Sequence, residues 1–132
     1  MRLATKNIEI GTFIKEQIDP IINTFPIIAD KGVQGDFCVY KRTGYRAKNT
    51  KDIYDYESTI SIEIIIACKT YKDSIRFAQL VKDKLEGWRG TWNDTDITSI
   101  FMDNTNEDWS NDLYIQKLYF TINVDDRPKT HK

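Results

Sequence analysis

Hydrophobic and polar residues alternate with a period of two between residues 57 and 69. One side of this pattern is apolar over most of its length and comprises Ser58, Ile60, Ile62, Ile64, Ile66 and Cys68. The other side starts polar, and only Ile65 and Ala67 interrupt it near its end. Because successive side chains of a strand point to opposite faces, the pattern predicts a strand with one face packed in the core.

The period becomes helical immediately after this strand. Apolar residues recur at three- and four-residue steps, with Phe77 widening the stripe formed by Ile75, Ala78, Val81 and Leu85. Thr70 and Asp73 have the spacing of an N-terminal cap, and Gly87 stands where a left-handed C-terminal cap is expected. We therefore predict an amphipathic helix that lays its stripe back on the apolar face of the strand.

The first segment, residues 7–18, also has a helical period, carried by Ile10, Phe13, Ile14 and Ile18. A short amphipathic helix fits this spacing better than a strand, and Asp19–Pro20 should end it because the residue before a proline avoids helical geometry. Phe25–Ile28 is predicted to be a short extended piece, which Pro26 confines to a sheet edge or a strand start. Asp30–Gly32 is predicted to be a turn.

Three further runs favour strands, at residues 37–42, 97–102 and 113–124. Two polar stretches without a period, residues 43–56 and 103–112, are interpreted as loops. Together these elements predict one α+β domain over residues 1–124, with a mostly antiparallel sheet of about four to five strands and two helices packed on one face. Residues 125–132 are expected to form a disordered tail.

Composition narrows the choice of function. The 132 residues include 19 basic and 20 acidic side chains, for a net charge of -1, whereas a general nucleic-acid binder usually has a strong basic excess. No apolar run approaches the ~20 residues of a membrane span, and the first residues lack the apolar region of a secretory signal. Cys38 and Cys68 have no CxxC spacing, so we expect two small buried side chains in a reducing compartment.

A search for catalytic and metal-binding patterns finds little. The only histidine is His131, and no zinc, phosphate-loop or dinucleotide motif is present. Asp52, Asp55 and Glu57 could be an unrecognised carboxylate site, but solvated loop charges explain them better. The three tryptophans Trp88, Trp92 and Trp109 should cover one end of the core, with base or sugar stacking as the alternative. We expect no enzymatic activity, no cofactor and no metal.

The arrangement of charge is more informative than its sum. Residues 41–51 carry five bases and no acid, namely Lys41, Arg42, Arg46, Lys48 and Lys51. Residues 103–112 carry four acids and no base, namely Asp103, Glu107, Asp108 and Asp112. Two independently solvated loops would account for this. The alternative is a head-to-tail ring, in which the basic loop of one subunit meets the acidic loop of the next.

A third interpretation uses Tyr40, Tyr45, Tyr54 and Tyr56, interleaved with these bases, as a nucleic-acid stacking surface or an adaptor module at residues 41–56. The neighbouring acids Asp52, Asp55 and Glu57 weaken this interpretation.

The order of segments resembles a known family. A short N-terminal helix is followed by FPIIADKG, FCVYKR and an NTKD loop. The alternating strand then runs directly into TYKDSIRFAQLVKDKLEGWRGTW, and ITSIFMDNTNEDW and YIQKLYFTINV complete the chain. This looks like the tail-completion and tail-terminator (head-to-tail joining) family of long-tailed phages and prophages, over Ile10 to about Val124. The match rests on order and spacing, since no single motif is diagnostic.

The resemblance implies a structural virion protein without catalytic residues. Proteins similar to this one cap the finished tail tube as a ring, typically of six copies, and dock it to the head connector. The implied partners are other copies of this chain, the major tail tube protein and the connector, with neither membrane nor nucleic acid. The implied location is the tail or neck of a virion made in bacterial cytoplasm. Candidate contact residues are Arg42, Tyr45, Arg46, Lys48, Lys51, Asp103, Glu107, Asp108 and Trp109, of which Trp109 and Tyr45 would be apolar anchors.

Overall fold

The computed structural model describes residues 9–29, 32–33, 35–47 and 57–125. Its elements in chain order are α2 (Ile10–Ile18), β1 (Thr24–Pro26), β2 (Phe37–Ala47), β3 (Glu57–Cys68), α3 (Tyr71–Leu85), β4 (Gly90–Trp92), β5 (Thr95–Ser110) and β6 (Leu113–Asp125). The strands form one six-stranded sheet in the order β1-β2-β3-β6-β5-β4. All neighbours pair antiparallel except β1, which is parallel to β2.

The predicted α+β class is confirmed, but the sheet has six strands rather than four to five. Both edge strands are three residues long: β1 overlaps the extended edge piece predicted at Phe25–Ile28, whereas β4 was not predicted. A segment this short cannot display a hydrophobic period, so only its hydrogen bonds define it as a strand.

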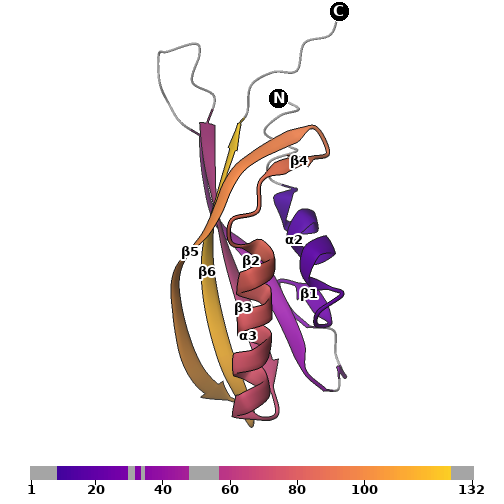
Figure 1. Cartoon of the computed structure of the whole chain (residues 1–132). Coiled ribbons are helices and arrows are strands. Elements are labelled where there is room, and N and C mark those ends of the chain that lie inside the picture. Colours follow the sequence, from indigo (N-terminus) through magenta and orange to yellow (C-terminus); the bar gives the residue numbers. More distant parts are fainter. Residues whose placement is uncertain (1–8, 30–31, 34, 48–56, 126–132) are drawn as a thin grey trace, which may run out of the picture.

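Both described helices pack on the same face of the curled sheet (Figure 1). The core lies between them and the sheet. Its centre is the row of isoleucines on β3, with Ile60, Ile62, Ile64 and Ile66 all fully buried. On the neighbouring β6, Leu118, Phe120, Ile122 and Val124 continue the same layer, as predicted.

Helix α3 has the predicted bounds, but its buried face is rotated from the predicted one. Ser74, Val81 and Leu85 are its buried residues, whereas Ile75 is 41% exposed. Buried Ser74 replaces Ile75 because its hydroxyl donates to the Tyr71 carbonyl (2.7 Å) and accepts from the Gln116 amide (3.2 Å), so this polar group is satisfied inside. Ile75 is left at the rim of the core.

Helix α2 buries all four predicted residues, Ile10, Phe13, Ile14 and Ile18. It ends at Ile18 as expected, although Asp19 keeps helical angles (φ -53°, ψ -37°). The expected displacement of the residue before Pro20 is therefore wrong. The ring of Pro20 has no N–H to continue the hydrogen-bond ladder, which is sufficient reason for the helix to end here.

The prediction that the three tryptophans cover one end of the core is confirmed for two of them. The ring of Phe13 packs edge-on against Trp88 (4.6 Å between centroids) and Trp92 (5.9 Å). The Trp92 indole also donates to Glu16 of α2 (3.0 Å). Trp109 lies elsewhere, on β5, and is 53% exposed, so the prediction is wrong for this residue.

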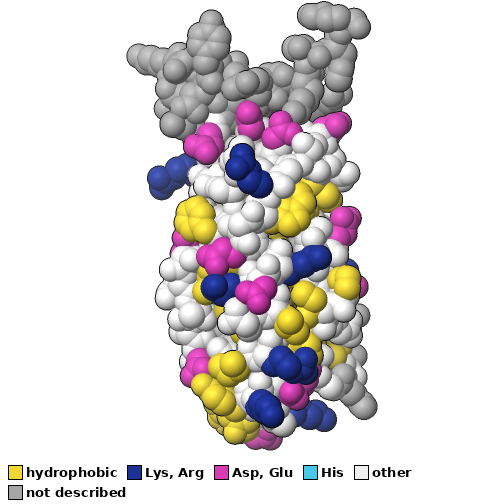
Figure 2. Space-filling view, viewed as in Figure 1, with side chains coloured by type: hydrophobic (Ala, Val, Ile, Leu, Met, Phe, Trp, Pro, Cys, Tyr) yellow, Lys and Arg dark blue, Asp and Glu magenta, His cyan; other side chains and the backbone are white. Residues whose placement is uncertain are grey.

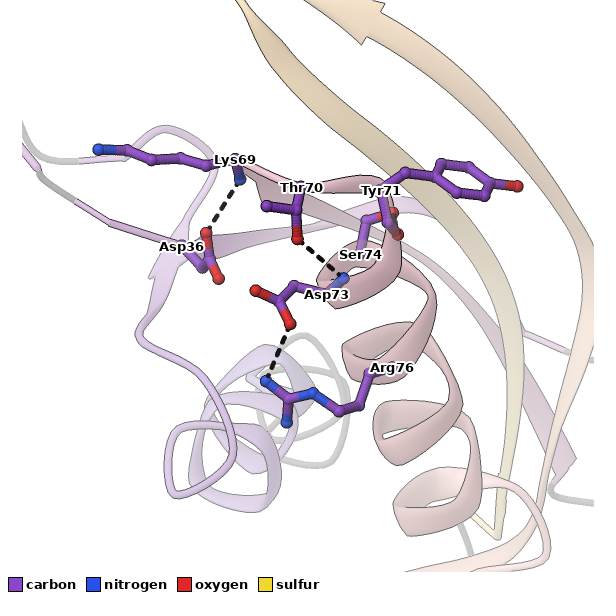
Figure 3. A network of polar contacts seen from close by, with 7 residues as sticks. All are labelled: Asp36, Lys69, Thr70, Tyr71, Asp73, Ser74 and Arg76. Atoms are coloured by element: carbon purple, nitrogen blue, oxygen red, sulfur yellow. Dashed lines mark hydrogen bonds and ion pairs between the residues drawn. The ribbon is translucent and has the colours of Figure 1, made fainter.

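The start of α3 is held by a polar network (Figure 3). The Thr70 hydroxyl accepts from the Asp73 N–H (3.1 Å), which is the predicted cap. Asp73 in turn pairs with Arg76 (3.4 Å), and Asp36 accepts from the Lys69 N–H (3.1 Å), which ties the β3–α3 turn to the chain entering β2. At the other end, Gly87 has the expected positive φ (+84°), but the residue that caps α3 is Glu86, which is extended (φ -65°, ψ 129°). The Gly87 N–H donates to the Ile100 carbonyl (2.8 Å), so Gly87 anchors β5 and does not cap the helix as predicted.

Thr70→Ala should lower the free energy of unfolding by about 1 kcal/mol, because the Asp73 N–H loses its acceptor at the helix end. Urea denaturation followed by circular dichroism measures this. Thr12→Ala, an exposed position in the first turn of α2, is the matched control and should change stability by less than about 0.5 kcal/mol. Equal losses in the two variants would contradict the role of the cap.

Two predictions lie wholly or partly outside the described residues. Of the expected turn at Asp30–Gly32, only Gly32 is described, with φ +84°. Of the expected tail at 125–132, Asp125 is the last residue of β6, and residues 126–132 are outside the described part.

Candidate functional site: two charged sides of one sheet

The described part of the basic segment is a strand and not the predicted loop. Strand β2 continues to Ala47, and its second half pairs with β3 from Ser58 to Ile62 across a bulge between Arg42 and Gly44. Arg42 and Arg46 are exposed. The loop prediction failed at 43–47 because the bulge shifts the alternation of side chains in mid-strand. Lys48 and Lys51, like Asp52 and Asp55, lie outside the described residues.

The side chain of Tyr45 is less accessible to a partner than that of an interface anchor would be. Its ring packs against the hydrophobic core, and its hydroxyl lies 3.4 Å from the Ser58 hydroxyl. On the opposite face of the sheet, Gly44, Arg46, Thr59 and Ser61 help to line a shallow hollow of about 320 Å³ that Tyr45 also borders.

The acidic segment is also a strand. Asp103, Glu107, Asp108 and Trp109 all belong to β5, which pairs with β6 as far as Ser110. Only Asn111 and Asp112 form the turn, both with positive φ (52° and 62°), as the two central residues of a type I′ hairpin require. The prediction of a loop at 103–112 is wrong because the last eight residues of β5 are exposed, so no buried face imposed a hydrophobic period.

The two charged segments, on β2 and β5, lie toward opposite edges of the sheet. Strands β3 and β6 separate β2 from β5, and the basic end of β2 is paired with the start of β3, whereas the acidic end of β5 is paired with the start of β6. Within the described ranges β2 holds three bases and no acid, and β5 holds four acids and no base. One subunit therefore cannot join its own basic strand to its own acidic strand.

Glu107 of β5 accepts two side-chain hydrogen bonds. Its carboxylate accepts from the Tyr71 hydroxyl (2.6 Å) and from the Gln116 amide (3.1 Å). The same amide also donates to the buried hydroxyl of Ser74 (3.2 Å). This network links α3, β5 and β6. Hydrogen bonds first from Tyr71 and then from Gln116 hold the pKa of Glu107 below its usual value.

Glu107→Gln should flatten the dependence of stability on pH in the acid range. A carboxyl whose pKa is lower in the folded than in the unfolded chain stabilises the fold above its unfolded pKa of about 4.3, and that contribution disappears as pH falls through the folded pKa. Urea midpoints between pH 3 and pH 6 measure the effect. Tyr71→Phe removes the first donor and should flatten the curve in the same sense, and an unchanged curve in both variants would contradict this assignment.

An exposed aromatic cluster lies next to this network. The ring of Tyr114 packs edge-on against Trp109 (4.7 Å between centroids) and Tyr71 (5.7 Å). Trp109 and Tyr71 are 53% and 48% exposed. Large, partly exposed aromatic rings of this kind are typical centres of protein–protein interfaces.

A groove runs between α3 and β5, which we call the α3–β5 groove. It has a volume of about 320 Å³ and is lined by Ile75, Ala78, Gln79, Lys82, Met102, Thr105, Asn106, Glu107, Gln116 and Leu118. Buried Leu118 and half-buried Met102 and Ala78 give it an apolar floor, and Glu107 lies at its wall. Figure 2 shows the corresponding face, on which exposed hydrophobic side chains alternate with charged ones of both signs.

The candidate chemistry of the described residues is limited. No group of three or more His, Cys, Asp or Glu side chains gathers to hold a metal within ranges 9–29, 32–33, 35–47 and 57–125. Both cysteines are free and buried as predicted, and burial raises the pKa of each thiol to about 12. No helix of the described part is long and apolar enough to cross a membrane.

Sequence reasoning missed the groove and a second surface feature, the exposed pair Ile27 and Ile28 (73% and 75% exposed). The pair could have been suspected from its position after Pro26, where no period assigns either side chain to a core. The groove has no sequence signal, because it is formed by residues of three elements.

Comparison with known proteins supports the fold. No protein-family model matches the chain, and no curated protein matches it. A solved structure described as "Virion of native gene transfer agent (GTA) particle" contains a chain with a similar fold. The TM-score is 0.62 at 10% sequence identity, and the match covers 92% of this chain and 90% of that chain. At this identity the likeness establishes a shared fold over nearly the whole length of both chains.

Proposed function

We propose that this chain is a structural protein of a virion, which caps the tail tube and joins it to the head connector as a ring of identical subunits. The observation that carries the proposal is the shared fold with a chain of a gene transfer agent virion over about nine tenths of each chain. The resemblance of the sequence to the tail-completion and tail-terminator family points to the same class of protein. Under this proposal the chain is not an enzyme.

The charge distribution supports the ring. Because the basic strand β2 and the acidic strand β5 lie on opposite sides of one sheet, their complementary charges can meet only between copies. Contacts between unlike surfaces of identical subunits close into rings when the rotation between subunits permits it. Exposed ion pairs contribute only about 0–1 kcal/mol each, so the ring also needs apolar contacts, for which the aromatic cluster at Trp109 is available.

The test is removal of the chain from the phage or prophage that encodes it. We expect electron micrographs of the lysate to contain filled heads and tails that are separate, and we expect purified chain to restore joined particles. Joined particles in the absence of the chain would overturn the proposal. The nucleic-acid alternative instead expects a salt-dependent mobility shift with DNA or RNA, which we do not expect at a net charge of -1.

A further inference from the structure

Two consecutive isoleucines protrude from the sheet edge formed by β1. Ile27 and Ile28, which we call the isoleucine knob, are 73% and 75% exposed, whereas the isoleucines of α2 and those on the helix side of β3 are fully buried. The knob is held firmly in place. The Ile27 N–H donates to the Tyr40 carbonyl of β2 (2.8 Å), and the Ile28 N–H donates to the Pro26 carbonyl (2.6 Å). Its exposure is therefore built into the edge of the sheet.

The backbone of the knob is strained. Ile27 has φ +64°, in the left-handed region that β-branched residues rarely adopt. Strained residues persist where the surrounding structure holds them, and they concentrate at functional sites. Here the strained backbone turns two apolar side chains outward rather than into the core. Gly or Asn would adopt the backbone angles of this solvent-exposed turn more easily. We therefore interpret the two isoleucines as a contact surface for a partner.

The knob lies at the β1 edge of the sheet, whereas the α3–β5 groove lies near the opposite edge, which β5 and β4 form. Its apolar floor of Met102, Leu118 and Ala78 and the 41% exposed Ile75 at its rim form a surface suited to aliphatic side chains. Its volume of about 320 Å³ corresponds to roughly ten water molecules, which accommodates two branched aliphatic side chains.

One flank of the groove is an unpaired strand. Strand β4 pairs only with Thr95–Ile97 of β5. Further along β5, the Ile100 carbonyl accepts from the Gly87 N–H, and the Met102 N–H donates to the Glu86 carboxylate. Beyond these contacts, no strand among the described residues pairs with the outer side of β5. A segment from another chain can therefore enter the groove beside this edge.

The charges around the two features are complementary. The knob lies beside β2, where the exposed bases Lys41 and Arg42 directly follow Tyr40. Lys41 pairs with Glu63 of its own subunit (3.5 Å), so Arg42 is the base that the contact would use. The groove lies beside the part of β5 that carries Asp103, Glu107 and Asp108, all exposed. Its lining also includes Lys82, whose charge is paired with Glu86 on the same helix (3.0 Å). Asp103 also accepts from the Thr121 hydroxyl, which fixes its position. Opposite charge on the two sides favours a single orientation of two copies and disfavours knob-to-knob or groove-to-groove pairing.

We infer that the isoleucine knob of one subunit inserts into the α3–β5 groove of a second copy of this chain. The contact is head-to-tail, since the two surfaces differ and lie on opposite sides of the sheet. It deepens the proposed function and rests on it, because it names the surfaces through which the ring would close. Ile27 and Ile28 fill the groove, while Arg42 faces the acidic strand β5 of the neighbour.

The test is cross-linking between introduced cysteines in the full chain. Both native thiols are buried with a pKa of about 12, so a short bismaleimide should react with the introduced thiols alone. The variant that combines Ile28→Cys in the knob with Thr105→Cys in the groove should give a ladder of covalent multimers at high protein concentration. A mixture of the two single variants should stop at covalent dimers, because each copy then offers only one half of the contact.

The matched control combines Ile28→Cys with Asp83→Cys, an exposed residue of α3 outside the groove. It should cross-link at least tenfold more slowly. Equal rates for the two pairs, no ladder from the groove pair, or dimers from Ile28→Cys alone would overturn the inference. Together with the lysate test, this experiment distinguishes a failure of the knob–groove contact from a failure of the proposed function. A ladder without a head-joining defect retains the contact and rejects the virion role, and the reverse result retains the role and rejects this contact.

Discussion

Phe13→Ala is expected to lower the free energy of unfolding by about 3–5 kcal/mol, the usual cost of removing a fully buried phenylalanine side chain. The effect should be at the upper end because Phe13 joins three parts of the core. Its ring carries the edge-on contacts to Trp88 and Trp92, so the cavity would separate α2 from the β4 turn. The total free energy of unfolding of a typical domain is only about 5–15 kcal/mol.

Urea denaturation monitored by tryptophan fluorescence should reveal this loss directly, since two tryptophans contact the deleted ring. Phe101→Ala, at a side chain 43% exposed on β5, is the matched control and should cost less than about 1.5 kcal/mol. A loss at Phe13 no larger than at Phe101 would show that α2 is not part of the core.

Under the proposed function, Trp109→Ala is expected to weaken assembly on the tail by roughly 30-fold or more, which corresponds to the cost of about 2 kcal/mol typical of an interface hot spot. Trp109 is half-exposed and is held by the Tyr114 ring, so it is ordered before any partner binds. The folded chain should lose only about 1 kcal/mol, from the aromatic contact.

Co-sedimentation of the chain with tail tubes measures assembly, and urea denaturation measures the fold. Trp109→Phe keeps an aromatic ring against Tyr114 and should retain most of the binding. If Trp109→Ala sediments like the unmodified chain, the aromatic cluster has no part in the interface, and the apolar contribution must come from elsewhere.

The parts of the fold that could be predicted are those where one face is dry. The isoleucines of β3 and the apolar positions of α2 and β6 each face the core over several turns or pleats, so the period of the sequence records the burial. The end of β2 was assigned to a loop because its bulge breaks the alternation of side chains, and the second half of β5 was assigned to a loop because its residues are exposed. Their structure is fixed by hydrogen bonds to β3 and β6, which leave no trace in hydrophobicity.

The candidate site could be predicted only as charge. The opposite signs of β2 and β5 are visible in the sequence, but their placement on opposite sides of the sheet depends on β6 lying between β3 and β5. Rim residues such as Ile75 were assigned to the core because a helical period cannot tell a buried position from one at the edge of a groove. The strained Ile27 likewise has no local signal, since its angles follow from the hydrogen bond to Tyr40.

The tight turn at Asn111–Asp112 has a consequence for how the chain folds. Strands β5 and β6 are joined by two residues, so this hairpin can form within about 1–10 μs, whereas the pairing of Glu57 with Asp125 must close a much longer loop. A β5–β6 hairpin that forms before β3 pairs with it has both edges bare. The four carboxylates of β5 would then repel a second nascent hairpin, so that the same charges would protect the chain against aggregation during synthesis.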